Sequence, residues 1–104
     1  DLLEAVLAEA DLRGAFCAGT NFFLADLRRA NCQEAILRQA DLQGGDLREA
    51  DLRRAQIQDA RLGGAELKGA LLQGADLLDS IGLTADQARE AVSDGTTRLP
   101  EYLR

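Results

Sequence analysis

A five-residue period runs through the chain from Asp1 to Ser80 without insertion or deletion. Sixteen consecutive blocks, from DLLEA to DLLDS, share it. The period matches neither the 3.6-residue turn of an α-helix nor the two-residue alternation of a β-strand. The chain must therefore turn a corner once per block. Such a repeat predicts a solenoid in which each unit is stabilised by its neighbours.

Two columns of the repeat are uncharged throughout. The fifth position is alanine except at Thr20, Gly45 and Ser80, and aromatic residues make up only 4% of the chain. We therefore expect an interior built from one large and one small side chain per block. The second position holds Leu2, Leu7, Leu12, Cys17, Phe22, Leu27, Cys32, Leu37, Leu42, Leu47, Leu52, Ile57, Leu62, Leu67, Leu72 and Leu77.

The remaining positions carry turn residues. The first position is mostly Asp or Asn, whose side chains bond to nearby backbone amides in turns. This predicts a structural role for these carboxylates and not a catalytic one. Glycine is expected at corners because it tolerates unusual backbone angles. The third and fourth positions contain Gly14, Gly19, Gly44, Gly63, Gly64, Gly69 and Gly74.

Blocks such as ADLRG, ADLRR, ANCQE, ADLQG and ADLRE follow an A(D/N)LXX pattern that resembles the pentapeptide-repeat protein family. The pattern covers roughly four-fifths of the chain. The resemblance implies an all-β solenoid, a right-handed quadrilateral β-helix with four blocks per coil and leucine at the centre of each side. About four coils would form a column roughly 19 Å tall. Residues twenty apart would then stack as ladders on its outer surface.

The period stops after Ile81, so we expect residues 1–81 to form the β-helix and 82–104 a C-terminal cap and tail. Thr84 is the predicted N-cap of a short capping α-helix over Ala85–Val92, and Gln87 completes a capping box. Further apolar residues expected in this cap are Leu83, Ala88, Ala91, Leu99, Tyr102 and Leu103.

The other end of the column has no comparable cover in the sequence. Leu2, Leu7, Leu12 and Cys17 form its terminal core layer. An apolar patch of this kind often marks an interface, so we expect contact with an unknown protein partner or self-association. A preceding domain, or missing residues upstream of Asp1, would cover the same end. The candidate interface residues on the outer surface are Leu3, Val6, Phe16, Phe23, Leu24 and Ile36, with Phe16 stacked under Ile36.

The chain contains few residues of the types that form catalytic sites. It has no histidine, and its two serines, Ser80 and Ser93, lie at the end of the repeat and in a turn. The glycine spacing of Gly64 to Gly69 resembles a phosphate loop, but Ala70 stands where such a loop has lysine. We therefore expect no enzyme activity, no cofactor and no catalytic residue.

The two cysteines, Cys17 and Cys32, occupy the second-position column, where a thiol behaves as a small buried hydrophobe. They fall on different sides of the predicted square, which predicts two free thiols.

One predicted side carries parallel acidic and basic ladders. A cation or ligand groove is one interpretation, and balanced repulsion between stacked coils is the other. Basic residues so close to the carboxylates oppose a metal site, so we expect no metal. The ladders are Asp26, Asp46 and Glu66 at first positions and Arg28, Arg48 and Lys68 at third positions.

The charge of the chain bears on its partners. A formal net charge of −6 argues against binding a nucleic acid, which needs a basic footprint. No apolar run reaches the length of a membrane span, so we expect no membrane partner; the compartment is open, with the cytoplasm preferred. We expect a non-enzymatic scaffold for protein–protein interaction, or else a structural appendage of a larger protein. The resemblance also suggests a protein that mimics duplex DNA and binds DNA gyrase. The short column and the mixed acidic and basic ladders argue against this role.

Overall fold

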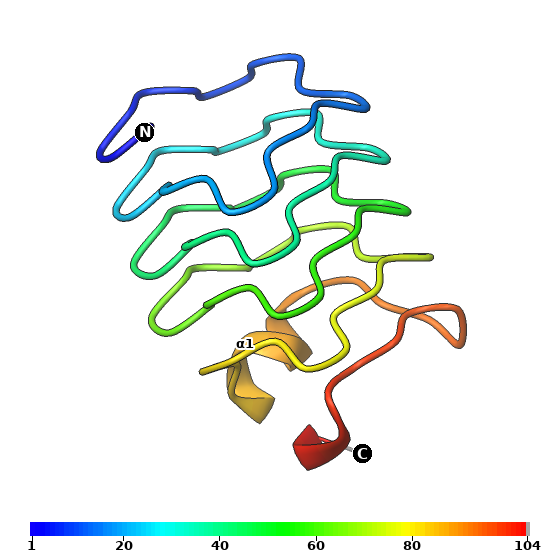
Figure 1. The fold of residues 1–104 in the computed structure, drawn as a ribbon. Helices are drawn as coiled ribbons and strands as arrows, with labels where there is room; N and C mark the ends of the chain where they lie inside the picture. The colour runs from blue at the N-terminus through cyan, green and yellow to red at the C-terminus, as the bar shows by residue number, and fades with distance from the viewer. Residues whose placement is uncertain (104) are drawn as a thin grey trace.

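The computed structural model describes residues 1–103 and shows a right-handed quadrilateral β-helix. Its coils stack into a column, and α1 (Ala85–Glu90) and the 3-10 helix η1 (Glu101–Leu103) lie at the C-terminal end (Figure 1). Parallel β-bridges join residues twenty apart, from Val6 with Asp26 to Arg61 with Ile81. One coil is therefore four blocks, and the predicted architecture is confirmed.

Backbone hydrogen bonds between coils follow the block register. The Leu27 amide donates to the Asp46 carbonyl at 2.8 Å, and the Arg29 amide donates to the Arg48 carbonyl at 3.0 Å. The Asp46 amide donates in the opposite direction, to the Ala25 carbonyl at 2.9 Å. Each side is too short for a long strand, so the pairing consists of single parallel bridges. These bonds satisfy the backbone between the turns.

The corners are four-residue turns. In each, the fifth-position amide donates to the second-position carbonyl, as Ala30 does to Leu27 at 3.0 Å. All sixteen fourth positions have positive φ and no third position does, which is the pattern of a type II turn. Six of them are glycine, and the other ten hold φ between 56° and 63°. The backbone angle that favours glycine therefore occurs at the fourth position alone, and Gly63, at a third position, does not have it.

The first-position Asp and Asn side chains have the predicted turn role. Each accepts a hydrogen bond from the amide two residues later; Asp41 Oδ1, for example, accepts from the Gln43 amide at 3.0 Å. Asn21 makes the same bond to the Phe23 amide at 2.9 Å, so the turn does not depend on a charge. The full set is Asp1, Asp11, Asn21, Asp26, Asn31, Asp41, Asp46, Asp51 and Asp76.

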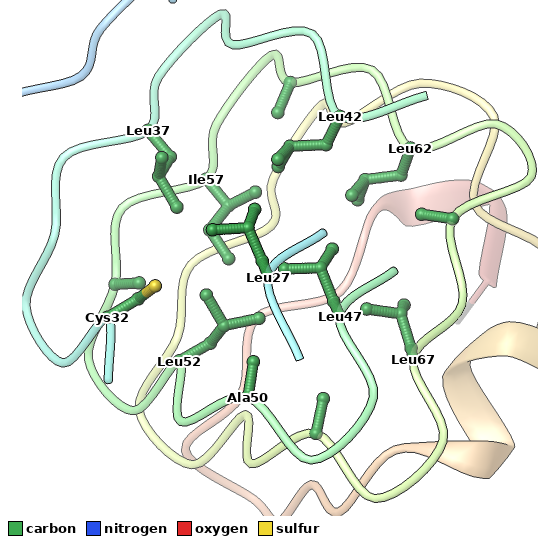
Figure 2. Packing of buried hydrophobic residues seen from close by; sticks show 14 of the residues in the cluster. Leu27, Cys32, Leu37, Leu42, Leu47, Ala50, Leu52, Ile57, Leu62 and Leu67 are labelled. Carbon is green, nitrogen blue, oxygen red and sulfur yellow. The ribbon is translucent and has the colours of Figure 1, made fainter. Parts of the chain in front are cut away.

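The second-position side chains meet along the axis of the column (Figure 2). Leu27, Leu47 and Leu67 stack on one side and are fully buried, and the fifth-position alanines fill the space between such residues. Burying a leucine stabilises the fold by about 2 kcal/mol. The inward residues of the first coil, Leu2, Leu7, Leu12 and Cys17, pack against this core but remain half-buried.

The cap begins as predicted and ends earlier. Thr84 and Gln87 form the capping box: the Gln87 amide donates to Thr84 Oγ1 at 3.1 Å, and the Thr84 amide donates to Gln87 Oε1 at 2.7 Å. The predicted helix end at Val92 is wrong, since α1 stops at Glu90. Val92 pairs instead with Leu71 in a parallel bridge.

The segment after α1 follows the path of a partial fifth coil. Ile81, Val92 and Arg98 form parallel bridges to Arg61, Leu71 and Asp76. Among the residues expected in the cap, Leu83 is buried, and Ala91, Leu99 and Leu103 pack against the core. The Tyr102 ring is exposed, but its hydroxyl donates to the Ser80 carbonyl at 2.8 Å.

Candidate functional site

The column presents four outer sides. Side A contains residues 1–5, 21–25, 41–45 and 61–65, and sides B, C and D follow at steps of five residues. Residues ten apart therefore lie on opposite sides, because a coil has twenty residues.

The six candidate interface residues divide between two places. Val6 and Phe16 are ten residues apart and lie on opposite sides, B and D. Phe16 and Ile36 form a parallel bridge on side D, as predicted; Phe16 is 77% exposed and Ile36 is half-buried. The other four surround the corner between sides A and B, and we name them the AB patch. It consists of Leu3, Val6, Phe23 and Leu24.

The AB patch is continuous between the first two coils. The Glu4 amide donates to the Phe23 carbonyl at 2.8 Å, which places Leu3 directly over Phe23. Val6 is 81% exposed, and Leu24 is exposed although its backbone has the left-handed φ of 60°. The Leu24 side chain lies over Gly44, where an added Cβ would stand 2.6 Å from Leu24 Cδ2. Because Gly44 has no side chain, the Leu24 side chain can occupy this space.

Two carboxylates of side A, the side that carries most of the AB patch, form no ion pair in the described chain. Glu4 stands between Leu3 and Val6 in sequence. Asp41 lies one coil below Asn21, and the parallel bridge below it joins it to Arg61. Neither Glu4 nor Asp41 takes part in any ion pair among residues 1–103. The cause is visible in the third positions of side A, which are Leu3, Phe23, Gln43 and Gly63 and contain no arginine.

Side B differs because its first-position aspartates are paired. Arg48 donates from Nε and Nη2 to the two Asp46 oxygens, at 2.8 and 2.6 Å. Arg28 contacts Asp26 in the same way, and its hydrogen bonds lower the pKa of that carboxyl to about 2. Glu66, the third residue of the acidic ladder, forms no ion pair among residues 1–103, so bidentate pairing is limited to Asp26 and Asp46.

A groove of about 510 Å³ runs along the third and fourth positions of side B. Its centre is Arg29, which lies 3.5 Å from Glu9 in the coil above and 2.9 Å from Glu49 in the coil below. The neighbouring Arg28 and Arg48 are held by their own aspartates. The three arginines of this groove are therefore paired, which agrees with the interpretation that the ladders offset repulsion, whereas Lys68 forms no ion pair among residues 1–103.

The cysteines are free, as predicted, and lie in the core column. Burial raises the pKa of the Cys32 thiol to about 12 and also raises that of Cys17, so neither has thiolate character near neutral pH. The Ser80 hydroxyl is buried and has no hydrogen-bond partner in the described part of the chain. Within residues 1–103, no three His, Cys, Asp or Glu side chains converge as metal ligands. Neither helix of that range has the length and apolar character to cross a membrane.

Comparison with known proteins agrees with this geometry. The sequence profile of pentapeptide repeats matches residues 1–31, 30–69 and 50–81, with eight copies. This chain belongs to the pentapeptide-repeat family. No curated protein matches it.

Two solved pentapeptide-repeat structures are similar. One is from the thylakoid lumen of Arabidopsis thaliana, with a TM-score of 0.73 and 26% identity over 86% of this chain and 58% of that one. The other is from Nostoc PCC 7120, with a TM-score of 0.57 and 33% identity over 92% of this chain and 74% of that one. This pentapeptide-repeat chain thus spans little more than half the length of the Arabidopsis protein.

Two features of the candidate site escaped prediction. The first is that the apolar residues lie on opposite sides of the column. Val6 and Phe16 are ten residues apart, which is half of a twenty-residue coil, so their spacing implies this arrangement. The unpaired state of Glu4 and Asp41 was overlooked too. Its signal is the absence of arginine at the third positions of side A.

Proposed function

We propose that this pentapeptide-repeat protein is a non-enzymatic scaffold that binds a protein partner through the outer surface of its first two coils. The observation that supports this is the AB patch, in which Leu3, Val6, Phe23 and Leu24 are exposed side by side. Patches of exposed apolar side chains often mark protein interfaces.

The backbone under the AB patch is already ordered. The Leu24 amide donates to the Gln43 carbonyl at 3.0 Å, and the Ala25 amide closes the turn onto Phe22 at 2.9 Å. A partner would therefore meet side chains held on a rigid corner. Binding to a preorganised surface loses less conformational entropy than binding to a flexible loop.

The chemistry of the chain supports binding and not catalysis. Histidine is absent, and burial keeps both thiols protonated near neutral pH. The net charge of −6 and the paired arginines of side B oppose a polyanionic partner. We include neither a nucleic acid nor a membrane among the proposed partners.

A pull-down with immobilised protein tests the proposal. Phe23→Gln removes the centre of the AB patch and should preserve the fold, because Gln43 occupies the same position one coil below. Gln56→Asn is the matched control, at an exposed first position on side D. A specific partner should be lost with Phe23→Gln and kept with Gln56→Asn. Equal capture by both variants, or no partner at all, would refute the proposal.

A second candidate is a structural appendage that stacks by its first coil. The half-buried state of Leu2, Leu7, Leu12 and Cys17 favours it. Light scattering at high concentration tests its self-associating form: a concentration-dependent dimer supports stacking between copies, and a strict monomer excludes it.

A further inference from the structure

We propose that the AB patch binds a protein segment that combines apolar side chains with Lys or Arg. This inference rests on the proposed docking function and names the chemistry of the partner. Three features support it. The surface is apolar, carboxylates of the same side form no ion pair within residues 1–103, and the fold does not need the charge of these carboxylates.

The apolar part has a definite shape. Phe23 and Leu24 project from the corner of the second coil, with Leu3 above them. Below Leu24, the same column holds only Gly44 and Gly64. The patch is therefore a step on the side of the column, and a segment lying along the column axis would place its apolar side chains against it.

The electrostatic part distinguishes side A from its neighbours. On sides B and C, four first-position aspartates each hold an arginine two residues later; Asp51 and Arg53, for example, approach to 2.7 Å. On side A, Asp41 is followed by Gln43 in that place. Glu4 likewise forms no ion pair in the described chain. Glu66 on side B and Asp59 and Asp79 on side D also form no ion pair among residues 1–103, but Glu4 and Asp41 lie on side A, which carries Leu3, Phe23 and Leu24.

The fold does not need this free charge. Asn21 forms the same turn bond as Asp41, and Gln39 occupies the same left-handed corner position as Glu4, with φ of 60°. An acidic segment, a nucleic acid or an anionic bilayer would be repelled by Glu4 and Asp41. A basic and apolar segment gains from both the apolar burial and the charge.

Peptide titration followed by amide NMR shifts tests the proposal. The probes are an amphipathic Leu/Lys peptide and the Leu/Glu peptide of the same length. The test variant is Glu4→Gln with Asp41→Asn, and the control is Asp59→Asn with Asp79→Asn, two carboxylates of side D with no ion pair among residues 1–103. Both variants change the net charge equally, and the wild-type residues at matching positions show that the fold accepts the test substitutions.

We expect the Leu/Lys peptide to shift the amides of residues 3–6, 23 and 24. The test variant should weaken its binding about fivefold at low ionic strength, and the control should leave it within twofold. Equal weakening by both variants, or shifts centred on another side, would overturn the proposal. Equal binding of the Leu/Glu peptide at the patch would also overturn it while leaving the docking function intact. Failure of the docking function itself is read from the Phe23→Gln pull-down.

Discussion

The two ends of the column differ in how their terminal coils are covered. At the C-terminal end, side chains of the cap replace the hydrogen bonds of a further coil. Gln87 Nε2 donates to the carbonyls of Leu62 and Ala65 at 2.9 and 2.8 Å, and Thr97 Oγ1 donates to the Leu72 carbonyl at 2.7 Å. The last coil therefore has its core covered and several of its edge carbonyls satisfied.

Within residues 1–103, by contrast, each inward side chain of the first coil has neighbours in one axial direction only. Leu7 is half-buried, whereas Leu27, directly below it, is buried. Because a solenoid repeat is stabilised mainly by its neighbours, the first coil should be the least stable part of the column. The proposed docking surface therefore lies at the less stable end of the column.

The largest expected effect comes from one substitution made at both ends. Leu67→Ala, in the fully buried position under the cap, should lower the free energy of unfolding by about 3 kcal/mol. Leu7→Ala, in the same column of the first coil, should lower it by about 1 kcal/mol, because Leu7 loses less burial. Urea titration measures both. Equal losses would contradict the difference between the ends.

The cap itself gives the next effect. Gln87→Ala removes the capping box and both side-chain bonds to the last coil, which should cost about 2 kcal/mol. Gln56→Ala, an exposed glutamine on side D, is the control and should change stability by less than about 0.5 kcal/mol. If the contacts of the cap with the last coil contribute nothing to stability, Gln87→Ala and Gln56→Ala will change the free energy of unfolding equally.

Substitutions at a corner of the second coil test backbone strain without changing either end of the column. Gln39→Gly should stabilise the protein by about 0.5 kcal/mol, because the release of strain at φ of 60° exceeds the entropy that glycine adds to the unfolded chain. Arg38→Gly, one residue earlier and without positive φ, should destabilise it by a similar amount through unfolded-state entropy. Thermal unfolding of both variants would show opposite signs, and a loss in both would show that the corners carry no strain.

The smallest effect concerns pH. The guanidinium groups of Arg13 and Arg28 lower the pKa of Asp11 and Asp26 from 3.8 to about 2. Since the folded-state pKa is depressed, this stabilisation is complete above about pH 4 and is lost as pH falls toward 2. Asp26→Asn should flatten the decline of the urea midpoint in that window. An unchanged decline would show that the pair on side B contributes nothing.

The repeat made the interior predictable, because every second and fifth position was restricted to apolar or small residues. The start of α1 was also predictable, since Thr84 and Gln87 form a local motif. Its end was not: Val92 leaves the helix to pair with Leu71, a contact far away in sequence. For the site, the apolar residues were found but their grouping required the coil register. The bonds from Gln87 to the last coil depend on tertiary placement that no local pattern contains.

Amide hydrogen exchange measures directly whether the column is less stable at its first coil than at its capped end. The Leu7 amide donates to the Asp26 carbonyl at 2.7 Å, and the Leu77 amide donates to the Arg98 carbonyl at 2.7 Å. Both are second-position amides with equal hydrogen bonds, so differences in exchange report local opening. We expect the Leu77 amide to exchange on the order of a hundredfold more slowly than that of Leu7. Equal protection of the two amides, or slower exchange at Leu7, would contradict the account.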